Sequence, residues 1–262
     1  MEYQASDKWE GKSSSMSSAP QLLKAPTTVV LTGGTSGIGY DLLGRLLDGG
    51  HKVVVIARRA SSLSPQPGLI PLDVDLADIA AVRAACARLA ADHTDTTVLI
   101  NNAALQYPAQ LTDPDFDPRQ MEAEVAINLV APALLAQALL PTLRHHGQRA
   151  AIINISSGLA YFPKQKTALY CATKAGLSSF TRSLRYQLES DGTLVSEVVL
   201  PLVDTPMTEG RGTGKIGAAA AAQAILAGIA ARHETIHVGK AKLIPMLSRL
   251  APGLGHRILR GS

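Results

Sequence analysis

Four polar residues in the middle of the chain have types and spacings that could transfer a proton. Tyr170 and Lys174 are four positions apart, so on a helix they share one face. A phenol with a pKa of about 10 is a poor acid or base at neutral pH, but a neighbouring ammonium lowers that pKa. Ser157 and Asn128 add a hydroxyl and an amide. A Tyr and a Lys at this spacing also occur on solvated helix faces, but the full set favours proton transfer at an oxygen atom.

A glycine-rich run near the start of the chain could hold a phosphate. It follows the β-branched run 28–31 and precedes a helical pattern at 37–47. The glycines remove side chains where the backbone turns tightly and approaches a pyrophosphate, and the helix N-terminus offers free N–H groups. An ordinary tight turn is the alternative, but the strand before it and the helix after it predict a dinucleotide site. The predicted binding residues are Thr32, Gly33, Thr35, Ser36, Gly37, Ile38 and Gly39.

The residues after the second predicted strand, 52–57, bear on the choice of nucleotide. Arg58 and Arg59 follow it, and no acid does. An acid at this point binds a ribose 2′-hydroxyl, whereas an arginine accommodates a 2′-phosphate. We therefore expect NADP(H), with NAD(H) as the second candidate and two surface arginines as the alternative interpretation. Asp73, followed by Val74, is expected either to accept a hydrogen bond from adenine or to cap a loop or helix.

Strand-like and helix-like segments alternate from Thr27 onward. This alternation predicts a single doubly wound, Rossmann-type α/β domain, with a seven-stranded parallel sheet and helices on both faces. The polar, Ser-rich residues 1–26 are expected to be a disordered tail, and the domain is expected at 27–262. Pro132 should bend or divide the long helical stretch. The strands are predicted at 28–31, 52–57, 68–72, 98–100, 151–155, 194–200 and 235–238, and the helices at 37–47, 79–89, 118–143, 167–188 and 217–231.

The composition excludes several classes of protein. Apolar residues make up 46% of the chain and aromatic residues 4%, which predicts an aliphatic core and excludes global disorder. Two cysteines, Cys86 and Cys171, exclude a disulfide framework and favour a reducing compartment, the cytoplasm. Few aromatics and no long basic stripe argue against nucleic-acid binding. No histidine is at ligand spacing with a cysteine, so we expect no metal site.

The C-terminal end is mildly amphipathic and basic. It could contact an anionic membrane surface. However, Pro252 and Gly253 interrupt any long helix, so we expect this end to pack on the body or on a partner subunit. The residues concerned are Met246, Leu247, Leu250, Leu254 and Ile258, with Arg249, Arg257 and Arg260.

In these motifs the chain resembles the short-chain dehydrogenase/reductase family, from Thr28 to about Val238. The resemblance rests on the glycine run, Asn101-Asn102-Ala103-Ala104, Asn128, Asn154-Ile155-Ser156-Ser157, Tyr170 with Lys174, and Pro201 with Thr205. Leu202 is a departure, because relatives have glycine there. Segments 156–163 and 238–252 resemble, more narrowly, a bacterial DltE-type subgroup.

The resemblance implies roles for these residues. Tyr170 would be the general acid for carbonyl reduction, and Lys174 would tune it and bond the nicotinamide ribose. Ser157 would orient the substrate, and Asn128 would anchor a water in a proton relay. Asn101 and Ala103 would support the adenosine side of the cofactor cleft. Pro201, Val203 and Thr205 would lie at the carboxamide. Relatives are dimers or tetramers, so a homodimer or homotetramer is expected.

We therefore expect an NADP(H)-dependent oxidoreductase that interconverts a carbonyl and a secondary alcohol in a small molecule. A catalytically silent NADP-binding regulator or scaffold is the alternative, but it would not need all four polar residues. A sugar epimerase or dehydratase would show a different glycine spacing. The short segment 207–216 should form a flexible lid because glycines recur in it. Because the lid is expected to be flexible, we expect an open active site that accepts bulky or polar substrates.

Overall fold

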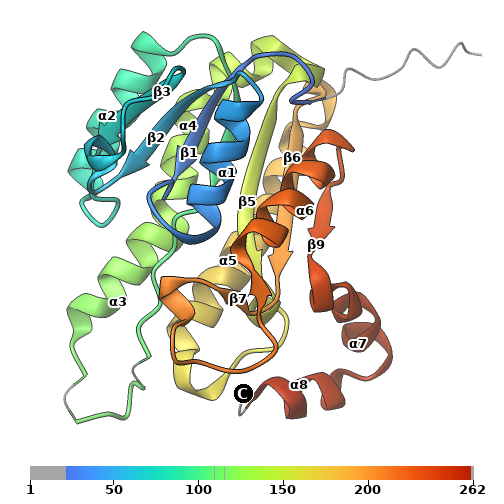
Figure 1. Cartoon of the computed structure of the whole chain (residues 1–262). Helices are drawn as coiled ribbons and strands as arrows, with labels where there is room; N and C mark the ends of the chain where they lie inside the picture. The colour runs from blue at the N-terminus through green and yellow to red at the C-terminus, as the bar shows by residue number, and fades with distance from the viewer. Residues whose placement is uncertain (1–21, 109, 115, 261–262) are drawn as a thin grey trace, which may run out of the picture.

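Seven parallel strands form one sheet, in the order β3-β2-β1-β4-β5-β6-β9 (Figure 1). The computed structural model describes residues 22–108, 110–114 and 116–260. Most of these strands consist of apolar residues that are buried on both faces of the sheet, as their continuous Val, Ile and Leu runs predict. The strands are β1 (Thr28–Thr32), β2 (Lys52–Ala57), β3 (Leu69–Asp73), β4 (Thr96–Asn101), β5 (Ala151–Ser157), β6 (Leu194–Leu200) and β9 (Thr235–His237).

Helices cover both faces of the sheet. On one face, α1 (Gly37–Asp48) and α6 (Ala218–Ala230) pack with Val29, Val53 and Ile153 in one apolar core. On the other, a second core is formed by α2 (Ile79–Asp92), α4 (Ala131–His146) and α5 (Ala168–Gln187). The doubly wound fold predicted from the sequence is confirmed. Loops contain the short turns η1 (Ala60–Ser62), η3 (Gly147–Arg149), η4 (Gly158–Ala160), η5 (Gln165–Thr167), η6 (Glu189–Asp191) and η7 (Pro206–Thr208).

The long helical stretch contains a change of helix type near its middle. Helix α3 (Pro118–Val125) passes into the π-helical turn η2 (Ala126–Val130), and α4 follows. Pro132 has no N–H with which to close the α-helical bond to the carbonyl of Asn128, which favours a wider turn there. This stretch is long and apolar enough to span a membrane, but α4 packs on α2 and β4 as a core helix.

Two further features complete the chain. Strands β7 (Val203–Asp204) and β8 (Ile216–Gly217) pair as a small parallel sheet and frame the residues between them, the lid. After β9, η8 (Gly239–Leu243) leads into α7 (Ile244–Leu250) and α8 (Pro252–Arg260), and the helices separate at the predicted break.

Leu22, which lies within the predicted tail 1–26, already packs against the domain. Leu22 is 3% exposed and packs in the core under α1 and α6, so a tail reaching Pro26 is wrong at its inner end. A leucine next to the sheet gains more from burial than a polar residue would, which offsets the cost of ordering the segment. The rest of the predicted tail, residues 1–21, lies outside the described residues.

Candidate active site

The glycine turn lies where the strand order reverses, between β1 and β4. Open α/β sheets bind ligands in the crevice at this point. The Thr32 hydroxyl oxygen accepts hydrogen bonds from the backbone N–H groups of Asn102 (3.0 Å) and Ala103 (2.9 Å). In return, Asn102 Nδ2 donates to the carbonyls of Thr32 (3.0 Å) and Gly33 (3.1 Å). These four bonds fix the glycine turn against the loop after β4.

Asn102 was missed as a site residue, although its neighbours Asn101 and Ala103 were predicted. Its place in the Asn101–Ala104 motif was the only signal in the sequence. The side chain of Asn101 donates from Nδ2 to Asn154 Oδ1 on β5 (2.8 Å), and its expected role beside the adenosine stays a prediction. Asn154 Nδ2 donates in turn to Thr181 Oγ1 on α5 (2.9 Å). The Asn101 side chain thus ties β4 to β5 and α5 and is buried.

The glycine turn fits a pyrophosphate. A Cβ on Gly39 would collide with the carbonyl oxygen of Gly33, and Gly33 itself has φ +72°. Only glycine therefore lets α1 begin this close to β1. Ser36 makes no side-chain capping bond to α1, and both Thr35 and Ser36 are exposed. The cradle has no side chains in the way, and the positive end of a helix faces it.

The two predicted phosphate-binding arginines are exposed on the turn after β2. Arg58 and Arg59 precede η1, and Asp73 at the end of β3 holds that turn. Asp73 accepts hydrogen bonds from the backbone N–H (2.8 Å) and the hydroxyl (2.6 Å) of Ser61, which lower the pKa of its carboxyl. Val74, which is buried, donates its N–H to the carbonyl of Ala57 (3.0 Å). Asp73 thus makes the loop contact that one of the two interpretations predicts, and its hydrogen bond to adenine stays a prediction.

The four predicted catalytic residues come together along α5. Tyr170 and Lys174 share a face of this helix, and Lys174 Nζ lies 5.7 Å from the centre of the Tyr170 ring. Ser157 ends β5, and its side chain lies close enough to the Tyr170 phenol to lower the pKa of that phenol. Asn128 Nδ2 donates to Thr173 Oγ1 (3.2 Å), beside Lys174. Chain segments from three elements thus converge on one phenol.

Burial dominates the acid–base behaviour of this group. It raises the pKa of Tyr170 above its ordinary value, while the Ser157 hydroxyl and the charge of Arg211 lower it. Lys174 is 2% exposed, and burial lowers its pKa to about 8. The net shift of the Tyr170 pKa is therefore upward in the chain by itself, whereas the sequence predicts a downward shift. The ammonium lies against the ring and donates to the carbonyl of Ile155 (2.8 Å), while loss of water around the phenol outweighs the other effects.

Asn128 and Glu124 hold the loop on the substrate side of the phenol. Asn128 Oδ1 accepts from the N–H of Leu105, and its Nδ2 donates to the carbonyl of Leu105, both at 2.8 Å. Glu124 Oε1 accepts from the N–H of Tyr107 (2.6 Å), and burial raises the pKa of its carboxyl. Glu124 was missed as a site residue. Its position four residues before Asn128 was the only signal, since it shares a helix face with that residue.

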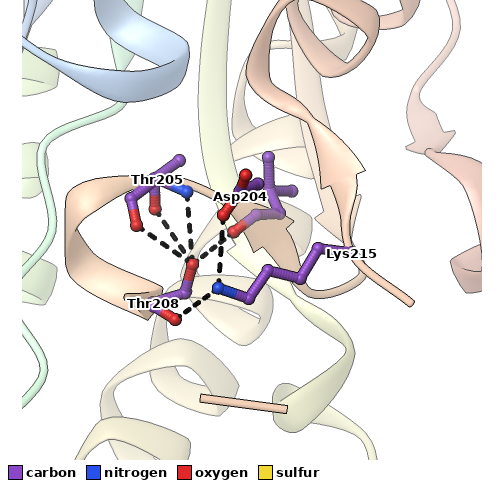
Figure 2. A network of polar contacts seen from close by, with 5 residues as sticks. Asp204, Thr205, Thr208 and Lys215 are labelled. Carbon is purple, nitrogen blue, oxygen red and sulfur yellow. Dashed lines mark hydrogen bonds and ion pairs between the residues drawn. The ribbon is translucent and has the colours of Figure 1, made fainter. Parts of the chain in front are cut away.

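The lid is fixed at its base and contacts the opposite loop at its tip. Thr208 Oγ1 donates to the carbonyl of Val203 and accepts from the N–H of Thr205, while Lys215 Nζ donates to the Thr208 carbonyl (2.7 Å) (Figure 2). A Cβ on Gly37 would lie 3.0 Å from Thr205 Cγ2, so the lid base adjoins the glycine turn. At the tip, Arg211 Nη1 donates to Gln106 Oε1 (2.8 Å).

Leu202, where relatives have glycine, fits without strain. Among the described residues, the non-glycine residues with positive φ are Leu23 and Arg232, so the Leu202 backbone needs no glycine-like conformation. Its side chain instead covers the lid, where a Cβ on Gly212 would lie 2.6 Å from Leu202 Cδ2. Gly212 has φ +56°. The preceding residue, Pro201, lies against Gly239.

Known proteins resemble this chain over most of its length. The family model described as short chain dehydrogenase matches residues 27–215. The Bacillus subtilis oxidoreductase DltE is 34% identical over 191 residues, covering 70% of this chain and 73% of that protein. Sulfoacetaldehyde reductase 2 of Chromohalobacter salexigens is 29% identical over 187 residues, covering 69% and 74%.

The fold of this chain is also similar to that of a solved structure. The short chain dehydrogenase from Burkholderia cenocepacia, in complex with NADP, superposes with a TM-score of 0.81 at 28% identity, covering 91% of this chain and 99% of that one. The family binds NAD(P) and acts on CH–OH groups and the corresponding carbonyls. With this match over residues 27–215, a glycine cradle, and Tyr170 beside a buried Lys174, this chain belongs to the short-chain dehydrogenase/reductase family.

Proposed function

We propose that this protein is an NADP(H)-dependent oxidoreductase that interconverts a carbonyl and a secondary alcohol, with Tyr170 as the general acid and base. The observation that carries the proposal is the position of the Tyr170 phenol, on the same helix face as the buried Lys174 and near the Ser157 hydroxyl at the end of β5. The raised pKa of the phenol keeps it protonated at neutral pH, the form that donates a proton to a carbonyl oxygen. The Ser157 hydroxyl can donate to the same oxygen and hold it beside the phenol.

Glycines 33, 37 and 39, Thr205 and Lys174 would hold the cofactor, which supplies or accepts the hydride when bound. The protein's own residues move the proton. Lys174 stabilises negative charge that develops on the Tyr170 oxygen, because its buried ammonium lies over the same ring. Asn128 supports a water that returns a proton toward Lys174, since Pro132 cannot close the α-helical bond to the Asn128 carbonyl.

The preference for NADP(H) over NAD(H) rests on the turn after β2. Arg58 and Arg59 are both exposed there, and Asp73 binds Ser61 of the same turn. A guanidinium can form two parallel hydrogen bonds to a phosphate, so this turn suits the 2′-phosphate of NADP(H). NAD(H) remains the second candidate because nothing in the glycine cradle itself discriminates between the two.

The polar lid favours a bulky or polar carbonyl compound or alcohol as substrate. Arg211 and Gln106 meet at the mouth of the site, and both are polar. We expect a homodimer or homotetramer in the cytoplasm, where the two free cysteines, both buried, would stay reduced.

The test is a screen of NADPH oxidation over ketones, aldehydes, quinones and ketoacyl esters, repeated with NADH. We expect turnover of at least one class, with NADPH preferred, and loss of that turnover in Tyr170→Phe. Tight NADPH binding with no turnover across the whole panel, in either direction, would instead indicate a silent binding protein.

A further inference from the structure

All of the excess positive charge of the chain lies in the C-terminal segment, residues 235–262. This segment has no Asp or Glu, whereas residues 1–234 hold 20 Lys or Arg and 21 Asp or Glu, against a net charge of +4 for the whole chain. Its basic residues are all exposed, and none of them forms an ion pair within the part of the chain that the structure describes. They are Lys240, Lys242, Arg249, Arg257 and Arg260.

The same segment exposes an apolar stripe. Five of the nine exposed large hydrophobic residues in the described chain lie here, three or four positions apart, and between 48% and 80% of each is exposed. Three of these residues precede the break at Ala251 and two lie on α8, so the segment exposes apolar side chains on both sides of the break. A patch of this kind on a folded protein marks an interaction surface. The stripe consists of Leu243, Met246, Leu250, Leu254 and Ile258.

The two helices are docked on the body of the protein. A failure to dock therefore does not explain why the stripe is exposed. Their inward faces pack on the body, where Ile244 of α7 joins the buried cluster around Phe162. A Cβ on Gly255 of α8 would collide with the Phe162 ring, and His256 meets that ring edge-on at 5.3 Å. Packing on the body, as the sequence predicts, therefore accounts for one face of these helices. It leaves the apolar outward face unexplained.

We propose that the outward face of α7 and α8 binds the surface of an anionic membrane. The stripe would enter the boundary between headgroups and acyl chains, and the flanking Lys and Arg side chains would contact lipid phosphates. A second copy of the chain fits this face poorly, because pairing would bring together two sets of five unpaired cations. The separation of the two helices at Ala251 does not oppose this binding, since each part of the segment carries exposed apolar residues and exposed cations.

This outward face lies at the same end of the molecule as the base of the lid. In Figure 1, α7 and α8 lie at the end of the molecule toward which β6 and β9 point, as does β7 at the base of the lid. A Cβ on Gly214, in the lid, would lie 3.0 Å from Lys240 Nζ, and Gly239 adjoins Pro201 and Ile216. Membrane binding would therefore turn the lid toward the bilayer.

The test is flotation of the full-length protein with vesicles of phosphatidylcholine alone or mixed with phosphatidylglycerol. We expect binding to the mixed vesicles that weakens at high salt. Leu250→Gln/Leu254→Gln should abolish it, and Arg257→Gln/Arg260→Gln should weaken it roughly 30-fold, about fivefold for each cation. The matched controls are Leu111→Gln, an equally exposed leucine elsewhere, and Arg83→Gln/Arg88→Gln on α2, and both should bind like the original protein.

Three outcomes would overturn the proposal. The first is no flotation with anionic vesicles, and the second is equal flotation of the Leu250→Gln/Leu254→Gln variant. The third is a fall in molar mass by light scattering in that variant without lipid, which would assign the face to a second copy. Because these exposed residues contribute little to the core, unchanged thermal unfolding should accompany every variant. Flotation does not depend on turnover, so the result stands whether or not the proposed reaction is correct.

Discussion

Lys174 and the two arginines after β2 carry the same charge in opposite settings. Lys174 is buried beside Tyr170, and its ammonium donates to the carbonyl of Ile155. Arg58 and Arg59 are exposed on a turn that Asp73 holds through Ser61. The proposed proton-transfer site thus includes a side chain that the core holds, whereas the core does not constrain the side chains that are proposed to select the cofactor. Substitutions in the two places should have different consequences.

The largest effect is expected at the phenol. Tyr170→Phe should lower kcat by at least about a hundredfold, because the proton donor is lost while the ring that packs beside Lys174 remains. NADPH affinity, measured by fluorescence titration, and the melting temperature should not change. A variant that retains more than a tenth of the activity would remove Tyr170 from the role of general acid.

Substitution of Asn128, a buried residue of the same site, should lower the stability of the protein as well as its activity. Asn128→Ala removes the hydrogen bonds to Leu105 and Thr173 and leaves half-buried backbone groups of Leu105 without these partners. We expect the free energy of unfolding to fall by about 3 kcal/mol in urea denaturation. Glu122→Ala, at an exposed position of α3, is a suitable comparison. Equal stability of Asn128→Ala and the original protein would contradict the picture of a wall fixed by the core.

Substitution of Arg58, on the turn after β2, should affect cofactor affinity and leave stability unchanged. Arg58→Asp should raise KM for NADPH by roughly 10- to 100-fold, because a charged hydrogen bond to phosphate is replaced by repulsion. KM for NADH should change little, and so should the melting temperature. The control is Arg83→Asp, which makes the same charge change on α2. If Arg58→Asp affected both cofactors equally, the turn would not read the 2′-phosphate.

The buried ammonium predicts a particular dependence on pH. Burial lowers the pKa of Lys174 to about 8, so its charge is complete below that pH and is lost as pH rises through it. The kcat for reduction should therefore fall about tenfold per pH unit above 8. Lys174→Arg, which stays charged, should be slower but should lack this descending limb. Identical pH profiles for the two proteins would assign the limb to another group.

The smallest effect is expected at the lid. Arg211→Ala breaks the contact with Gln106 but leaves the base of the lid, held by Thr208 and Lys215, intact. We expect KM for the carbonyl substrate to rise only a fewfold, with kcat nearly unchanged. Lys215→Ala, which loosens the base, should have the larger effect of the two. The reverse order would mean that the tip rather than the base positions the lid.

The sequence predicted most of the scaffold but only part of the site. Strands β2 and β6 were predicted to the residue, because β2 is a short apolar run that ends before two arginines and β6 is a β-branched-rich run that ends before Pro201. Asn102 and Glu124 were missed because their partners are backbone groups of distant segments, which no periodicity reveals. The direction of the Tyr170 pKa shift was wrong for the chain by itself, since desolvation depends on packing that only the folded chain has.

Leu202 and Gly212 touch across the lid, and this couples their evolution and their engineering. A side chain at position 212 has no room while leucine occupies position 202, so a larger lid residue would be accepted only after Leu202 has been shortened. The order of substitution should therefore matter, because Leu202→Gly would make a later change at 212 tolerable and the reverse order would pass through an impaired intermediate. Libraries that vary the lid alone should be dominated by inactive members, and those that vary both positions together should yield new specificities.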